Sequence, residues 1–161
     1  MIDKIKDSHI LLSWGVTVAL AWILTPVMGA QGYLASEVMY MWTVLMLPPV
    51  ILTGILKYRN DSNKLFDVWA VLVILLMIQN FLTPASIAVY SYFHLWIVAG
   101  ALAFYYTSKH IPPPSKKTYL YAAYASVAMM PLVIYRPLLS PLVAAVVQGG
   151  PMVYDYYTVH N

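Results

Sequence analysis

Long apolar runs alternate with short polar segments along the whole chain, and this pattern predicts its elements. A helix needs about 20 mostly apolar residues to cross a bilayer. Runs of about that length lie at residues 10–28, 38–56, 68–84, 87–107 and 118–135. The first run is longer than the roughly 7–15 residues of a signal-peptide core, so we read it as a span. The pattern predicts an all-α polytopic transmembrane helical bundle that forms a single domain over residues 1–161.

A further apolar segment, at residues 138–154, leaves two alternatives open. Its interior holds four residues that disfavour a regular helix, Pro141, Gly149, Gly150 and Pro151. As a sixth span it requires a turn of little more than residues 135–137. As a re-entrant or surface-lying piece it leaves the C-terminus on the far side of the membrane. We favour about five spans plus this partial segment, with a sixth span as the alternative.

Composition places the chain in the same class. Hydrophobic residues make up 61% of the sequence and charged residues 9%, whereas soluble domains carry roughly 25% charged residues. The net charge of +3 comes from dispersed lysines and arginines, which form no basic groove, so we expect the lipid bilayer and no nucleic acid as a partner. The absence of cysteine excludes disulfides and thiolate ligands.

The basic residues predict the orientation. Of the nine lysines and arginines, only Arg136 falls beyond the end of the fifth run. The other eight lie before the first run or in the connections after the second and fourth, at Lys4, Lys6, Lys57, Arg59, Lys64, Lys109, Lys116 and Lys117. Because cytoplasmic loops are enriched in lysine and arginine, we expect a cytoplasmic N-terminus and a multi-pass protein of the cell membrane.

Polar residues inside the apolar runs are few. No aspartate, glutamate, lysine or arginine lies deep within the first five runs, which argues against proton pumps, ion-coupled carriers and intramembrane aspartyl hydrolases. His94 is the one deep ionisable side chain. Counting residues from a turn near Ser86 places His94 at the depth of Gln79, with Asn80 beside it, so a hydrogen bond between the two helices is expected.

His94 admits three interpretations. We favour a neutral, structural histidine bonded to Gln79 or Asn80. The alternatives are a cofactor-binding contact to a quinone, pigment or lipid headgroup, and metal or haem ligation, for which a second deep histidine is lacking. Asp155, His160 and Glu37, which we place with Arg136 on the outer side, could gather a divalent metal only if the fold brought them together. We assign no cofactor and no metal.

The aromatic and small residues have structural interpretations. Tyrosines at span ends are typical of interfacial belts, and these are Tyr90, Tyr92, Tyr105, Tyr106, Tyr119 and Tyr121. The five tryptophans are expected to be packing or belt residues rather than a cofactor box. Pairs of small residues four apart, which let helices approach closely, occur at Gly15 and Ala19, Ala99 and Ala103, and Ala122 and Ser126.

These observations favour an accessory, structural subunit of a larger membrane complex, such as an energy-transducing or oxidising enzyme. Such a subunit would pack against a catalytic neighbour and would not be an enzyme by itself. Other membrane subunits are then the expected partners. The alternative is a small-molecule-binding or lipid-binding membrane protein, or a carrier, with a pocket near His94.

Overall fold

The computed structural model describes the backbone of residues 7–59, 64–83 and 85–159, and the side chains of residues 9–59, 64–83 and 93–158. All regular structure in these ranges is helical. The first four helices are α1 (Asp7–Ala30), α2 (Ala35–Tyr58), α3 (Lys64–Leu82) and α4 (Ala85–His110). They cover the first four predicted runs, so the all-α class is confirmed.

The second half of the chain forms two further helical rods. α5 (Ser115–Ala128) and α6 (Met130–Tyr135) follow one another with an interruption at Met129, close to Pro131, which cannot donate a backbone hydrogen bond. The last rod consists of α7 (Ser140–Ala144), the π-helical turn η2 (Ala145–Gly149) and α8 (Gly150–Val159). We call this last rod, residues 140–159, the C-terminal rod.

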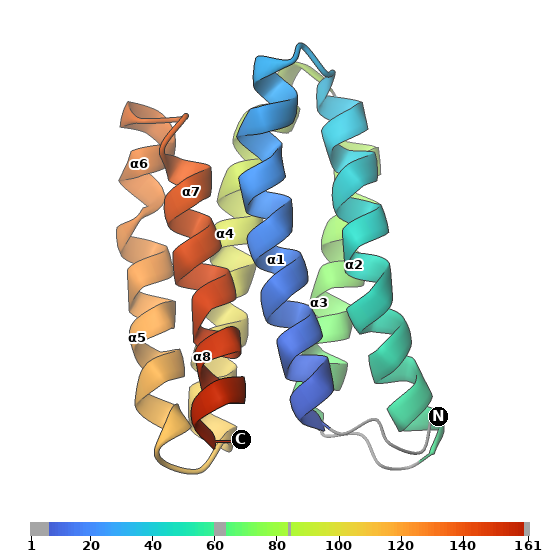
Figure 1. The fold of residues 1–161 in the computed structure, drawn as a ribbon. Helices are drawn as coiled ribbons and strands as arrows, with labels where there is room; N and C mark the ends of the chain where they lie inside the picture. Colours follow the sequence, from blue (N-terminus) through green and yellow to red (C-terminus); the bar gives the residue numbers. More distant parts are fainter. Residues whose placement is uncertain (1–6, 60–63, 84, 160–161) are drawn as a thin grey trace.

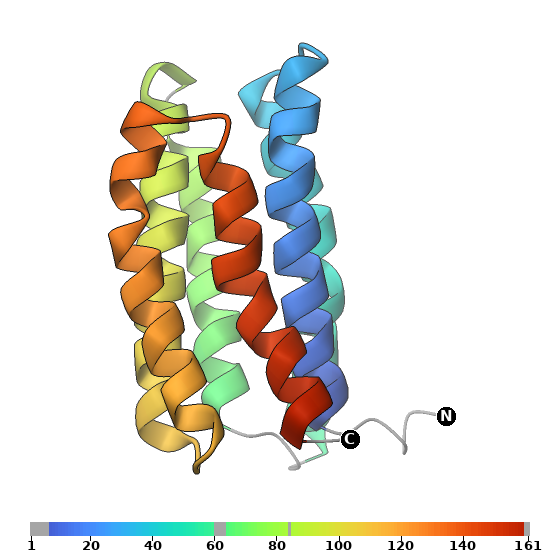
Figure 2. The ribbon, with the colours of Figure 1, turned by 60° about the vertical axis from the view of Figure 1, so that its left-hand side comes forward.

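The six rods stand side by side and form a closed ring. α1 packs against α2, α2 against α3, α3 against α4, and α4 against α5. The C-terminal rod closes the ring, because it contacts α5 on one side and α1 on the other. Figures 1 and 2 show this rod, in red, between the orange α5 and the blue α1. The start of α1 and the end of α8 therefore lie at the same end of the bundle.

Four of the rods are long and apolar enough to cross a membrane. They comprise His9–Ala30, Ala35–Tyr58, Lys64–Leu82 and Ser115–Tyr135. Since about 20 apolar residues suffice to span the hydrocarbon core, these four are candidate membrane-spanning helices in the described part of the chain.

The C-terminal rod is helical throughout residues 140–159, although its proline and glycine residues disfavour a regular helix. Its glycines permit a close approach to α1. A Cβ added to Gly149 would lie 2.6 Å from the Cβ of Ala19 and 2.8 Å from the carbonyl oxygen of Gly15. A Cβ on Gly15 would in turn lie 2.9 Å from the Cβ of Met152. The small residues Gly15 and Ala19 thus serve a contact inside the chain.

The tryptophans fill the interior of the ring. All five are buried, and they come from the first four helices. The rings of Trp22 and Trp42 meet edge to face with centroids 4.9 Å apart, Trp42 and Trp96 lie 4.6 Å apart, and Trp14 and Trp69 lie 6.0 Å apart. Their expected role in packing agrees with this burial, whereas a place in an interfacial belt does not.

Gln148, on the π-helical turn, inserts a polar group into this aromatic interior. Its side chain is 4% exposed. Its Oε1 accepts a hydrogen bond of 3.0 Å from Nε1 of Trp22, and its Nε2 donates to the carbonyl oxygen of Ile97 at 3.3 Å. The side chain passes so close to Gly100 that a Cβ there would lie 2.4 Å from Nε2. Gln148 therefore ties the C-terminal rod to both α1 and α4.

The basic residues gather at one end of the bundle. Lys57, Lys64, Lys109 and Lys116 lie at the ends of α2 and α4 and the beginnings of α3 and α5, which meet at the end where α1 begins. Arg136 follows α6 at the opposite end. Lys4 and Lys6 lie outside the described residues.

Candidate functional site

A buried carboxylate lies at the basic end of the bundle. Asp155, on α8, is 1% exposed. Its Oδ1 accepts a hydrogen bond from the hydroxyl of Ser115, and its Oδ2 accepts one of 3.1 Å from the hydroxyl of Tyr119. Both of its hydrogen-bond partners in the described part of the chain are therefore neutral. A carboxylate can accept about four hydrogen bonds, so half of its capacity is left.

The local sequence explains how this carboxylate is placed. Ser115 is the first residue of α5, and Tyr119 lies one turn later on the same face. The amide groups at a helix N-terminus carry partial positive charge, which stabilises a nearby anion. Asp155 stands at this end of α5 because α8 runs antiparallel to α5 and contacts it. Neutral donors and the helix dipole thus hold the carboxylate in place.

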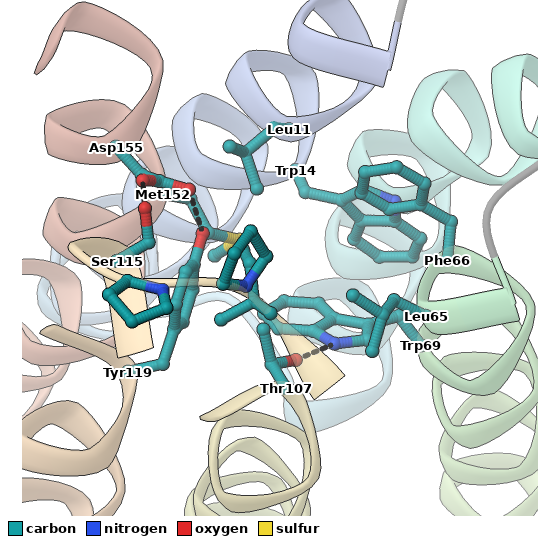
Figure 3. Close-up of a pocket in the computed structure, with 13 residues that line it drawn as sticks. Leu11, Trp14, Leu65, Phe66, Trp69, Thr107, Ser115, Tyr119, Met152 and Asp155 are labelled. Carbon is teal, nitrogen blue, oxygen red and sulfur yellow. Dashed lines mark hydrogen bonds between the residues drawn. The ribbon is translucent and has the colours of Figure 1, made fainter. Parts of the chain in front are cut away.

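A cavity of about 190 Å³ adjoins the carboxylate. Figure 3 shows Asp155, Ser115 and Tyr119 on one side of it and the rings of Trp14, Phe66 and Trp69 on the other. The exposed prolines Pro112 and Pro113, in the connection between α4 and α5, also line the cavity, which therefore reaches the surface at this end. Such a volume suits a molecule somewhat larger than benzene, which occupies an engineered cavity of about 150 Å³.

Two tryptophans of this cavity differ in their hydrogen bonding. Nε1 of Trp69 donates to Oγ1 of Thr107 at 2.9 Å. Trp14 is 0% exposed, and its Nε1 has no hydrogen-bond partner among the described residues. A buried N–H without an acceptor costs roughly 1–3 kcal/mol. Trp14 and Asp155 thus both line this cavity while almost fully buried, the one with an unpaired donor and the other with unused acceptor capacity.

Two predictions about these residues are wrong. Asp155 was expected on the outer side with Glu37 and Arg136, but it contacts Ser115, at the end of the bundle opposite to both. Tyr119 was expected in an interfacial belt, but it is 0% exposed and bonded to Asp155. Tyr121, by contrast, is exposed as a belt residue would be. The reason for both errors is the return of the C-terminal rod along α5.

The predicted site residues lie elsewhere, on α3 and α4. His94 is half-buried. The amide of Gln79 donates to the hydroxyl of Thr83, and Thr83 donates back to the carbonyl oxygen of Gln79 at 2.9 Å. Asn80 is buried, and its Oδ1 has no hydrogen-bond partner within the described ranges. The hydrogen bond between His94 and Gln79 or Asn80 stays a prediction.

The acidic residues considered for a metal are separated. Oε2 of Glu37 accepts a hydrogen bond of 2.7 Å from the backbone N–H of Leu34, at the start of α2. Asp155 lies at the opposite end of the bundle. His160, like the side chains of Tyr90 and Tyr92, lies outside the described residues. Glu37 and Asp155 therefore cannot share one ion.

The fold and the site together define an all-helical protein with four candidate membrane-spanning helices and a small cavity beside a buried carboxylate. No protein-family model matches the chain, and no curated protein or solved structure is significantly similar to it. The functional argument therefore rests on the site.

Proposed function

We propose that this protein binds a small molecule in the cavity beside Asp155. The supporting observation is the carboxylate itself, at 1% exposure within an apolar bundle. Ionisable groups in such surroundings are costly, and they are retained mainly where they bind, relay or transport. A carboxylate held by two neutral hydroxyls at the wall of a cavity can accept further hydrogen bonds from a ligand. This proposal moves the binding pocket from His94 to the other end of the bundle.

The proposed topology has six crossings. α4 and the C-terminal rod pack alongside the four apolar rods, and both run between the same two ends. The end with Lys57, Lys64, Lys109 and Lys116 would face the cytoplasm of a cell membrane by the positive-inside rule. Both termini would then be cytoplasmic, and the cavity would open toward the cytoplasm.

Cysteine labelling tests whether the cavity is a reachable binding site. The chain contains no cysteine, so single variants can be compared directly. Met152→Cys places a thiol at the cavity wall, and Met46→Cys places one in the core outside this cavity. We expect a small methanethiosulfonate reagent to modify Met152→Cys much faster than Met46→Cys. An extract of small molecules from the native membranes should slow the first reaction only. Equal, very slow modification of both variants would refute the proposal.

An accessory role in a membrane complex is the second candidate function. Its support is the scarcity of chain outside the helices, since described connections such as residues 31–34, 111–114 and 136–139 are only a few residues long. Contacts with other proteins would then use the helix faces in the bilayer. Purification from native membranes at native expression level tests this role: comigration with other membrane subunits supports it, and a solitary protein that still binds a ligand refutes it.

A further inference from the structure

We infer that the cavity selects a small organic cation, an ammonium compound with an aromatic or similarly flat body and an acceptor oxygen. This inference rests on the proposed binding function and specifies its ligand class. It combines the carboxylate of Asp155, the aromatic walls and the free N–H of Trp14.

The charge of the ligand follows from the partners of Asp155. Its two described partners are hydroxyls, and no lysine, arginine or histidine is among the residues that line the cavity. A cation entering the cavity would therefore meet an anion that no lining side chain neutralises. An ammonium group donates charge-assisted hydrogen bonds to a carboxylate, which are about twice as strong as neutral ones. A ligand anion would instead be repelled.

The body of the ligand follows from the opposite wall. Trp14, Phe66 and Trp69 contribute aromatic rings to the cavity. Rings of this kind bury flat apolar groups and attract cations through their electron-rich faces. The cavity of about 190 Å³ limits the ligand to roughly one ring with a short chain. An inorganic ion would leave these aromatic walls without a function.

The acceptor oxygen follows from Trp14. Its N–H is buried and lacks a described partner, whereas the N–H of Trp69 on the same wall is bonded to Thr107. A ligand oxygen that accepts from Trp14 would satisfy this donor. Nε1 of Trp14 would thereby gain the acceptor that the described residues do not supply.

Three probes of similar size separate these features. Tyramine has an ammonium group and a phenol oxygen, tyrosol replaces the ammonium with a hydroxyl, and phenethylamine lacks the phenol oxygen. Binding is measured on the purified, full-length protein by calorimetry, and by protection of Met152→Cys against the thiol reagent. We expect tyramine to bind about tenfold or more tighter than tyrosol, as a charge-assisted bond requires, and tighter than phenethylamine.

Three variants identify the groups responsible. Asp155→Asn should abolish the preference for tyramine over tyrosol, while Asp67→Asn, which removes a carboxylate paired with Lys57 outside the cavity, should leave it unchanged. Trp14→Phe should abolish the preference for tyramine over phenethylamine. The comparison of tyramine with tyrosol in the wild-type protein needs no variant, so it decides the question even if Asp155→Asn does not fold.

The outcomes distinguish this inference from the proposed function. If tyrosol binds as tightly as tyramine, or if no probe binds although Met152→Cys is readily modified, the cation inference is overturned and the binding function stands. If Met152→Cys is as unreactive as Met46→Cys, the cavity is closed and both proposals are overturned.

Discussion

Gly149 and Gly150 are neighbours in the C-terminal rod, yet their replacement by alanine should have opposite effects. A Cβ on Gly149 would lie 2.6 Å from the Cβ of Ala19, 2.8 Å from the carbonyl oxygen of Gly15 and 3.0 Å from the backbone nitrogen of Ala19. A Cβ on Gly150 meets nothing within 4 Å. The two substitutions therefore add the same methyl group to crowded and to open space.

The magnitude follows from these contacts. Ordinary contacts between carbon atoms are about 3.5–4.0 Å, so Gly149→Ala requires the rod and α1 to separate by about 1 Å. The obstructing atoms belong to the backbone and a Cβ, which no rotamer change can move. Overpacking of this kind destabilises by about 1–3 kcal/mol. Both substitutions also gain about 0.5–1 kcal/mol of helix propensity, which cancels in the comparison. Gly149→Ala should therefore be about 1–3 kcal/mol less stable than Gly150→Ala.

The assay is unfolding in dodecyl maltoside micelles by titration with sodium dodecyl sulfate, followed by tryptophan fluorescence. The five buried tryptophans make this signal sensitive to opening of the bundle. Gly150→Ala, the matched control, should be at least as stable as the wild type. Equal stability of the two variants would show that residue 149 does not pack against α1. The C-terminal rod would then not lie along α1, and the re-entrant alternative would regain support.

Two further predictions concern topology and the polar core. Single-cysteine variants at Lys116, Arg136 and Thr158 can be labelled from either side of the membrane. We expect a reagent on one side to label Lys116→Cys and Thr158→Cys, and a reagent on the other side to label Arg136→Cys. Labelling of positions 136 and 158 from the same side would contradict the six crossings. Trp22→Phe should lower the free energy of unfolding by about 1–3 kcal/mol more than Trp14→Phe, because only the first truncation leaves Oε1 of Gln148 without its donor. Equal losses in the same titration would show that this hydrogen bond contributes nothing.

The fold could largely be predicted because apolar length is a strong signal. Helices α1 to α4 and the α5–α6 rod lie where the apolar runs predict them. The C-terminal rod is only one of two alternatives in the sequence, because Gly149, Gly150 and Pro151 disfavour a regular helix when taken one by one. The value of a glycine here depends on the helix that packs against it, because Gly149 permits contact with Ala19 on α1, far away in the sequence. No local pattern contains that information.

The site was missed for a related reason. The depth count that pairs His94 with Gln79 requires two helices, and the sequence leaves the helical state of the last segment open. Had residues 140–159 been read as a helix, the same count would have paired Tyr119 with Asp155. Both lie about 18 residues from the turn near residue 137, hence at about the same depth. The signal was therefore present in the sequence, but it depended on the one element left undecided.

The hydrogen bonding of the tryptophans supports a ligand at this place more than packing alone does. Trp22, Trp42 and Trp69 each donate to a side-chain oxygen from another helix, on Gln148, Thr25 and Thr107. Three of the five buried indole groups thus have acceptors that the bundle itself supplies. Nε1 of Trp14 has no described acceptor, and Figure 3 shows Trp14 with Phe66 and Trp69 on the side of the cavity across from Asp155. A ligand oxygen would complete this pattern, and its ammonium group would complete the hydrogen bonding of Asp155.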